Sequence, residues 1–341
     1  MKNVPALCIC ASFNRTQIIS DIIGTDIFPD HFLCSKDAAT EFAEVKASGR
    51  PVVLVVLGPL GYSGIKLLTD DYDKPQSERR VKWIHSCSAG LDWYRFGELQ
   101  KEIQGIPITT GKGGYNALLA QHVVYSILYF ARQTAHQQRN RAAKKWDPFE
   151  LEETRGLQVG ILGYGEIGRE TAKMLQPMYM DVTGVKRNQS AETEDEYGAK
   201  LVSGDEERDR VIRESDIVVN ILPATPETEG MFDLERFKTM KRSAIYINIG
   251  RGATQVDNEL AEAISTGVIA GASLDVFQQE PLPLASPLWD IDDDKILLTS
   301  HNACLTEKSF RDTIGLFTKY AKEYMTTGKL NAYLADAKLG Y

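Results

Sequence analysis

Three polar residues of this sequence are of types that bind carboxylates and transfer protons. Arg251, Glu280 and His301 each follow an apolar run, "AIYINIG", "GASLDVFQQ" and "KILLTS", so each is expected beyond the end of a strand. An arginine fork binds a carboxylate and polarises a carbonyl, while a histidine transfers protons near neutral pH. A neighbouring glutamate favours the charged imidazolium and fixes its ring. The set suits reduction of a 2-oxo acid, in which the carbonyl carbon receives a hydride and its oxygen a proton.

A glycine-rich turn, "VGILGYGEIGRE" at 159–170, indicates where a dinucleotide would bind. A strand enters the turn and a helix leaves it, which is the context that a dinucleotide fingerprint requires. The first glycine permits the tight turn, the second lets a pyrophosphate approach the backbone, and the third lets helix and strand pack closely. The alternative is an ordinary strand-to-helix turn. The predicted cofactor contacts here are Gly163, Gly165, Glu166, Ile167 and Gly168.

The end of the next strand indicates which dinucleotide is preferred. An NAD site carries an acidic residue about 20 positions after the first glycine, where it binds the ribose 2′-hydroxyl. This chain has Lys186, Arg187 and Asn188 there. Basic side chains attract a 2′-phosphate, and an arginine can bind it through two hydrogen bonds. The sequence therefore predicts NADP(H), with NAD(H) as the alternative if these side chains only answer the acidic run at 192–196.

Two series of strands must position these residues. Runs rich in Val and Ile without polar alternation are typical of parallel sheets covered on both faces. A helical segment over 116–146 separates the two series, and a last helix is expected over 306–327. The expected strands are 6–12, 32–35, 51–57, 81–88 and 106–110, then 157–163, 181–187, 199–203, 216–223, 244–250, 271–276 and 295–301.

Bulk properties narrow the class of protein further. A chain of 341 residues, 43% hydrophobic and 25% charged, is expected to fold into two domains. The net charge of −8 argues against nucleic acid or an anionic membrane as the main partner. The sequence contains no membrane-length apolar run and no evident secretory signal. Five cysteines without a framework spacing fit reduced thiols, so a cytoplasmic location is expected.

The segment from "INIGRGATQVDNELAEAISTGVIAGASLDVFQQEPLP" through "SPLWD" to "ILLTSHNA" resembles the D-isomer-specific 2-hydroxyacid dehydrogenases. The resemblance extends from about residue 80 onward and is closest to the glyoxylate/hydroxypyruvate reductase branch. It implies two α/β domains with doubly wound parallel sheets, a Rossmann-type one inserted into a flavodoxin-like one. The implied dinucleotide-binding domain spans 112–301, and the implied substrate domain combines 1–111 with 302–341.

The same resemblance implies roles for individual residues. Arg251 would bind the substrate carboxylate and carbonyl, His301 would be the acid/base, and Glu280 its partner. The loop of Ser88, Ala89 and Gly90 would receive the substrate carboxylate on its backbone amides, and Trp289 would line the substrate pocket. The remaining implied cofactor contacts are Leu222, Pro223, Thr228 and Asp275, the last facing the nicotinamide amide. A homodimer formed through the apolar stripe at 118–131 is also implied.

Other sites and functions fit parts of the sequence less well. The pairs His85 with Cys87 and His301 with Cys304 each offer two ligands, whereas a closed zinc site needs four, so no metal is predicted. An NAD-dependent D-lactate dehydrogenase is the same-class alternative, which the missing acidic residue disfavours. Some proteins of this fold are dinucleotide-sensing corepressors that retain the three site residues. The lack of basic localisation runs and disordered tails disfavours that scaffold role.

Overall fold

The computed structural model describes residues 4–12, 15–188, 192–332 and 334–336, which form two compact units. One unit combines residues 1–115 with 305–341, and the other comprises residues 116–304. Each unit contains one entirely parallel sheet, of five strands in the first and seven in the second. The predicted architecture is therefore confirmed, with one α/β domain inserted into the chain of another.

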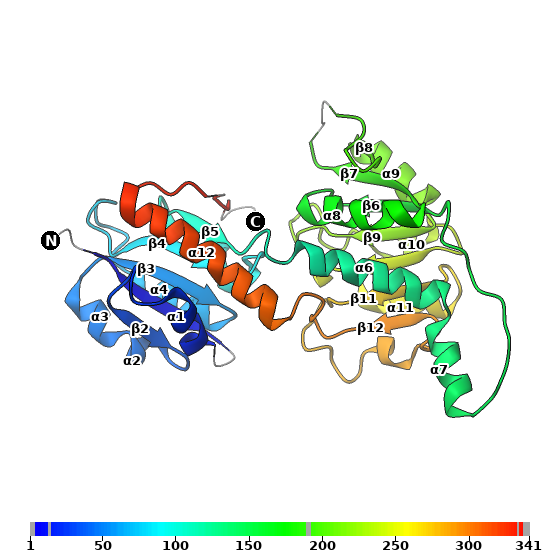
Figure 1. Ribbon diagram of the computed structural model, residues 1–341, viewed down its shortest axis with the longest axis horizontal. Coiled ribbons are helices and arrows are strands. Elements are labelled where there is room, and N and C mark those ends of the chain that lie inside the picture. The colour runs from blue at the N-terminus through cyan, green and yellow to red at the C-terminus, as the bar shows by residue number, and fades with distance from the viewer. Residues whose placement is uncertain (1–3, 13–14, 189–191, 333, 337–341) are drawn as a thin grey trace. The chain divides into compact units, whose positions relative to one another are not determined.

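The sheet of the first unit has the strand order β2-β1-β3-β4-β5. Neighbouring residues of β1 point to opposite faces, so Leu7 and Ile9 join one core while Cys8 and Cys10 join the other. Helices α1 and α12 cover the first of these cores, and α2, α3 and α4 cover the second (Figure 1). The strands are β1 (Ala6–Ala11), β2 (His31–Cys34), β3 (Val52–Leu57), β4 (Val81–Ser86) and β5 (Ile108–Thr110), and the helices are α1 (Thr16–Ile23), α2 (Ala38–Glu41), α3 (Ala43–Ser48), α4 (Leu60–Leu68), α5 (Gln100–Ile103) and α12 (Glu307–Thr327).

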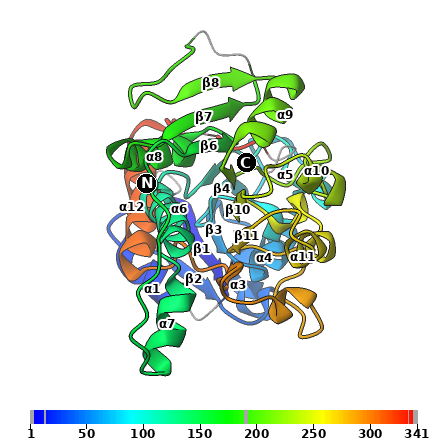
Figure 2. The same ribbon diagram turned by 90° about the vertical axis from the view of Figure 1, so that its right-hand side faces the viewer.

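The sheet of the second unit has the strand order β12-β11-β10-β9-β6-β7-β8. Helices α6 and α8 lie on one face of this sheet, and α9, α10 and α11 lie on the other (Figure 2). The chain runs outward from β6 to β8 and then crosses to β9, so the order reverses between β6 and β9. The strands are β6 (Gln158–Leu162), β7 (Asp181–Lys186), β8 (Lys200–Ser203), β9 (Ile217–Asn220), β10 (Ile245–Asn248), β11 (Gly271–Leu274) and β12 (Ile296–Leu298), and the helices are α6 (Asn116–Ala131), α8 (Glu166–Leu175), α9 (Asp205–Glu214), α10 (Leu234–Lys238) and α11 (Asp257–Ser265).

All twelve expected strands are present, but the helical segment expected over 116–146 is interrupted. Helix α6 ends at Ala131, and α7 (Thr134–Ala142) begins after Gln133, whose φ of 47° is left-handed and breaks the helical backbone. Helix α7 and the segment after it extend away from the rest of the second unit as an arm (Figure 1). The last expected helix is confirmed as α12, which ends at Thr327 and is followed by Gly328 in the left-handed conformation.

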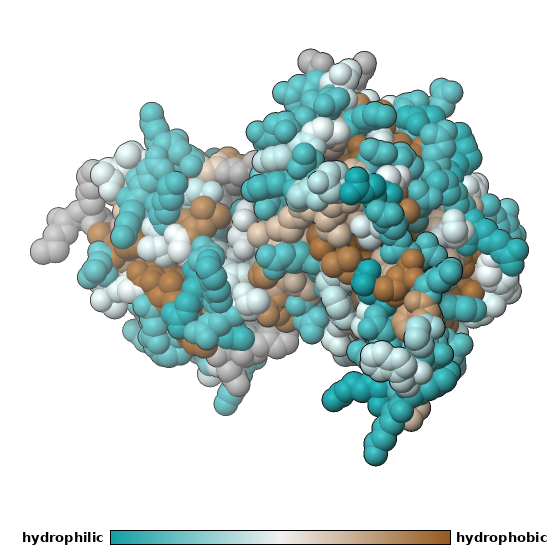
Figure 3. Space-filling view, turned by 45° about the vertical axis from the view of Figure 1, so that its right-hand side comes forward, coloured by the Kyte–Doolittle hydropathy of each residue, from teal (hydrophilic) through white to brown (hydrophobic). Residues whose placement is uncertain are grey.

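The surface matches the charged composition of the chain. Hydrophilic side chains dominate the visible face, and several hydrophobic patches lie between them (Figure 3). Of the helices in the part of the chain that is described, none has the length and apolar character needed to cross a membrane.

Candidate functional site

The glycine turn lies at the carboxyl end of β6, beside the point where the strand order of the second unit reverses. In doubly wound sheets this is where ligands bind. Gly163 has a φ of +88°, and a Cβ there would lie 2.9 Å from the Ile221 carbonyl oxygen, so both its conformation and its surroundings require glycine. A Cβ at Gly165 would meet no described atom within 4 Å, which leaves its backbone open to an approaching group.

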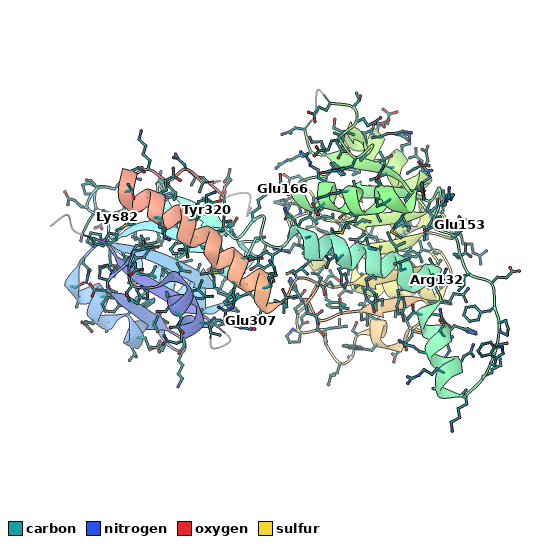
Figure 4. The ribbon with its side chains drawn as sticks, in the orientation of Figure 1. Lys82, Arg132, Glu153, Glu166, Glu307 and Tyr320 are labelled. Atoms are coloured by element: carbon teal, nitrogen blue, oxygen red, sulfur yellow. The ribbon has the colours of Figure 1, made fainter. Side chains whose placement is uncertain are left out.

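Helix α8 begins directly after this turn, with Glu166 as its first residue (Figure 4). No side chain in the described part of the chain caps its N-terminus through a hydrogen bond. Its first N–H groups therefore point outward with the positive end of the helix dipole, an arrangement that suits a phosphate. The turn fits a dinucleotide pyrophosphate, as the sequence predicts.

Tyr164, inside the turn, fills space that the neighbouring strand leaves open. A Cβ at Gly184 on β7 would lie 2.2 Å from the Tyr164 ring, so only glycine there admits the ring. The Tyr164 hydroxyl donates a hydrogen bond to Asp195, in the segment between β7 and β8. Burial, followed by that hydrogen bond, raises the pKa of Tyr164, so the hydroxyl stays protonated. The turn is thereby joined to β7 and to the segment that follows it.

Two further glycines let the loops after the next strands pack backbone against backbone. A Cβ at Gly250, after β10, would lie 2.7 Å from the Leu222 carbonyl oxygen, after β9. A Cβ at Gly252 would lie only 2.0 Å from the Phe277 backbone, after β11. The loops that follow these strands therefore lie against one another at one edge of the sheet.

Two buried asparagines, which sequence analysis missed, hold these loops. Asn220 ends β9 and accepts the Leu222 N–H at 3.0 Å, and Asn248 ends β10 and accepts the Gly250 N–H at 2.9 Å. Both are fully buried, and their amide groups donate to partners inside the unit, including Thr254, which offsets the cost of burial. The signal in the sequence is an asparagine closing each of two apolar strands, "IVVN" and "IYIN".

Arg251 occupies the loop after β10 and is fixed through its backbone. Its carbonyl oxygen accepts hydrogen bonds from the Thr254 hydroxyl at 2.6 Å and from the Asn248 amide at 3.2 Å. Its guanidinium donates to the Gly250 carbonyl at 2.8 Å and is partly exposed. The charge of Arg251 contributes to lowering the pKa of Glu280, so the two predicted residues act on one another.

Glu280 and His301 form the hydrogen-bonded pair that the sequence predicts. His301 Nδ1 lies 2.7 Å from one carboxylate oxygen of Glu280, and the Phe277 N–H donates to the other at 3.0 Å. Burial opposes ionisation of Glu280, but these two hydrogen bonds and the His301 charge hold its pKa below the usual value. The carboxylate therefore remains charged at neutral pH. With Nδ1 engaged, the His301 ring keeps Nε2 for another partner.

Asp275 holds the turn that carries His301. Its buried carboxylate accepts the Thr299 hydroxyl at 2.6 Å and the backbone N–H groups of Asn302 and Ala303 at 3.0 and 3.2 Å. His301 itself has a left-handed φ of 51°, which is unusual for a residue other than glycine. These hydrogen bonds stabilise the turn despite that conformation. A contact of Asp275 with nicotinamide stays a prediction.

The basic residues predicted to read a 2′-phosphate lie at the carboxyl end of β7. Lys186 is partly buried, and Arg187 and Asn188 are exposed. A hydrogen bond from Thr225 and, to a smaller extent, the Arg187 charge lower the pKa of Glu227, in the loop after β9. An acidic group therefore lies within electrostatic range of this basic end.

The loop that contains Leu222 and Pro223 is closed by hydrogen bonds within it. The Thr228 hydroxyl donates to the Pro223 carbonyl at 2.6 Å and accepts the Thr225 N–H at 2.9 Å. Thr228 therefore shapes the loop, and its contact with a cofactor stays a prediction.

The loop of Ser88, Ala89 and Gly90 belongs to the first unit and follows β4. The Ser88 carbonyl accepts the Gly111 N–H at 3.2 Å, and the Ser88 N–H donates to the Ser86 hydroxyl at 3.0 Å. Within the described ranges, the N–H groups of Ala89 and Gly90 have no hydrogen-bond partner. Two adjacent, unpaired N–H groups on a fixed loop can bind a carboxylate oxygen.

Trp289 lies in a short 3₁₀ helix, Pro287–Asp290, and is 52% exposed. Its indole N–H donates to the Pro283 carbonyl at 3.0 Å, which fixes the ring within its own loop. The predicted role of this ring in a substrate pocket stays a prediction. Among the described side chains, no three His, Cys, Asp or Glu residues gather where they could hold a metal ion.

Comparisons with known proteins agree with this geometry. Residues 124–303 match the model of the D-isomer specific 2-hydroxyacid dehydrogenase, NAD binding domain. Glyoxylate/hydroxypyruvate reductase A of Photorhabdus laumondii is 29% identical over 79% of this chain and 85% of its own, and that of Yersinia enterocolitica is 30% identical over 67% and 73%. The fold matches a probable 2-hydroxyacid dehydrogenase from Rhizobium etli with a TM-score of 0.78 and 24% identity, over 99% of each chain.

Proposed function

Since the chain belongs to the D-isomer specific 2-hydroxyacid dehydrogenase family, we propose that it reduces small 2-oxo acids with NADP(H). The expected substrates are of the glyoxylate, hydroxypyruvate and pyruvate type, and the products are D-2-hydroxy acids. The observation that carries the proposal is the 2.7 Å pair of His301 and Glu280, with Arg251 acting on the same carboxylate.

The residues of the second unit divide the work of reduction. Bound NADPH supplies the hydride. Arg251 binds the substrate carboxylate and polarises its carbonyl, so that negative charge developing on the oxygen is stabilised. His301 donates a proton from Nε2 to that oxygen, while Glu280 holds Nδ1–H and stabilises the imidazolium. In the reverse direction the same nitrogen accepts the proton of the hydroxyl group.

The remaining predicted residues have binding roles in this proposal. The Ala89 and Gly90 amides bind a carboxylate oxygen, and Trp289 limits the size of the substrate. Asp275 contacts the nicotinamide amide, and the glycine turn with Leu222, Pro223 and Thr228 binds the dinucleotide.

Selectivity for NADP(H) is proposed to come from Lys186, Arg187 and Asn188. The similar protein from Rhizobium etli has been solved in complex with NADP, which supports this choice. The acidic Glu227 near Arg187 opposes it, because a carboxylate repels a 2′-phosphate. The net positive charge at the end of β7 favours the phosphate.

Initial rates with NADPH and NADH test the proposal, with glyoxylate and phenylpyruvate as a small and a large 2-oxo acid. We expect NADPH to be preferred, and replacing both Lys186 and Arg187 by alanine to remove the preference. Arg242→Ala, an exposed change of the same type at another loop, is the control and should retain it. Absence of turnover with every 2-oxo acid would overturn the reaction. Faster turnover with NADH would overturn only the cofactor choice.

We also propose that the chain forms a homodimer. Much of the apolar stripe at 118–131 packs into the core of its own unit. Tyr125 on α6 is 46% exposed, and the arm after α6 exposes Trp146 at 95% and Leu151 at 38%. Exposed apolar side chains that gather into one patch mark surfaces that a partner covers, and we propose that these three side chains belong to such a patch.

A further inference from the structure

A buried network links the loop of Arg251 to the loop of Glu280. The Asn248 side chain, beneath Arg251, donates to the Gln255 Oε1 at 2.8 Å. Gln255 in turn donates from Nε2 to the Asp257 Oδ1 at 2.9 Å. Asn248 and Gln255 are fully buried, and Asp257 is 8% exposed.

Asp257 passes this network on to the loop after β11. Its Oδ2 accepts the Gln278 N–H at 3.1 Å, and its own N–H donates to the Gln278 side chain at 2.8 Å. Gln278 is thus held on both sides by one residue. It directly follows Phe277, whose N–H donates to Glu280.

We propose that Asp257 is a positioning residue of the reductase site, which holds the 277–280 segment so that Glu280 meets His301. This inference rests on the proposed function, because it takes Glu280 and His301 as the proton-transfer pair. Asp257 forms no hydrogen bond to that pair in the described structure, so its hydrogen bonds reach the pair only through the segment. The Glu280 charge adds to the burial that raises the pKa of Asp257, so the two carboxylates also interact through their charges.

The direction of the hydrogen bonds explains why a carboxylate is required. Both oxygens of Asp257 face donors, Gln255 Nε2 on one side and the Gln278 N–H on the other. An asparagine would turn its NH₂ toward one of these donors. Gln255 cannot compensate by flipping its amide, because its oxygen already accepts from Asn248. Asp257→Asn therefore loses one hydrogen bond at nearly constant volume.

Steady-state kinetics of the full-length Asp257→Asn variant with NADPH and glyoxylate test the role. We expect kcat to fall about tenfold or more, since small misplacements of reacting groups are costly, while KM for NADPH stays within about twofold. The alkaline limb of the reductive pH–rate profile should move to lower pH, as it should in Glu280→Gln. Asp233→Asn, at a helix N-cap where asparagine also caps, is the matched control and should change neither quantity.

A double-mutant cycle separates positioning from general stability. If Asp257 acts through Glu280, Asp257→Asn should cost little more in a Glu280→Gln background. Additive losses, or an Asp257→Asn variant with wild-type kcat and pH profile, would overturn the inference. If Asp257→Asn does not fold, Gln278→Leu removes the hydrogen bond from the Asp257 N–H to the Gln278 side chain. An unchanged kcat and pH–rate profile in that variant would overturn the inference equally. A wild-type rate in His301→Ala would instead refute the proposed function.

Discussion

Replacing Glu280 by glutamine tests the proton-transfer pair with almost no change in shape. The carboxylate accepts two N–H groups, from His301 on one oxygen and from Phe277 on the other. A glutamine has one acceptor oxygen, so its NH₂ must face one of these donors. If it faces His301, Nδ1 must lose its proton, and the imidazolium needed for reduction is disfavoured.

The size of the effect follows from the geometry of the pair. The two charges are centred about 4 Å apart, which corresponds to about 4 kcal/mol at an effective dielectric constant of 20 and about 1 kcal/mol in water. The side chains are 39% and 26% exposed, so a value of about 2 kcal/mol is reasonable after solvent screening. Since 1.36 kcal/mol corresponds to a factor of ten, losing this interaction should lower the rate of reduction about 30-fold.

The assay is the pH dependence of kcat/KM for glyoxylate reduction by wild type and Glu280→Gln at saturating NADPH. We expect kcat/KM of the variant to fall about 30-fold at neutral pH and further at alkaline pH, because no carboxylate supports the imidazolium. NADPH binding, followed by fluorescence, should be unchanged. A variant whose profile overlays that of wild type would refute the assignment of Glu280 as the group that supports His301.

Two further changes test the cofactor turn and the oligomer. Gly163→Ala should abolish NADPH binding and lower the melting temperature, because the φ of Gly163 is +88° and a Cβ there would press on Ile221. Gly315→Ala, with open space around it on α12, is the control and should do neither. NADPH binding by Gly163→Ala would contradict the proposed turn. Trp146→Ser should raise the dimer dissociation constant about tenfold in sedimentation experiments because it removes a 95% exposed indole, and a wild-type protein that stays monomeric at all concentrations would contradict the homodimer.

The strands could be predicted because each is a short apolar run, and a central strand of a parallel sheet buries the side chains of such a run on both faces. The break between α6 and α7 could not be predicted, because no glycine or proline near Gln133 signals its left-handed conformation. By local pattern, the apolar residues of α6 and the polar residues of α7 fit one continuous helix as well as they fit two. Only the packing of the folded unit distinguishes the two.

Arg251, Glu280 and His301 could be predicted as a group because each comes just after a strand of one parallel sheet. Parallel strands bring their carboxyl ends to one edge, so residues 50 positions apart in the chain come together without any local signal. The hydrogen-bond partners of the three residues could not be predicted. Which atom accepts from which donor depends on side-chain orientation, and no spacing rule encodes it.

Asp257 shows why such residues escape sequence analysis. It stands in the first turn of α11, where an acidic residue is explained by the helix dipole alone. Burial raises its pKa, although the Gln255 and Gln278 hydrogen bonds oppose that shift, so the fold keeps a buried carboxylate at a cost in solvation. A helix cap at the surface would avoid that cost. The burial is accounted for when the carboxylate also fixes Gln278, and with it the segment that presents Glu280 to His301.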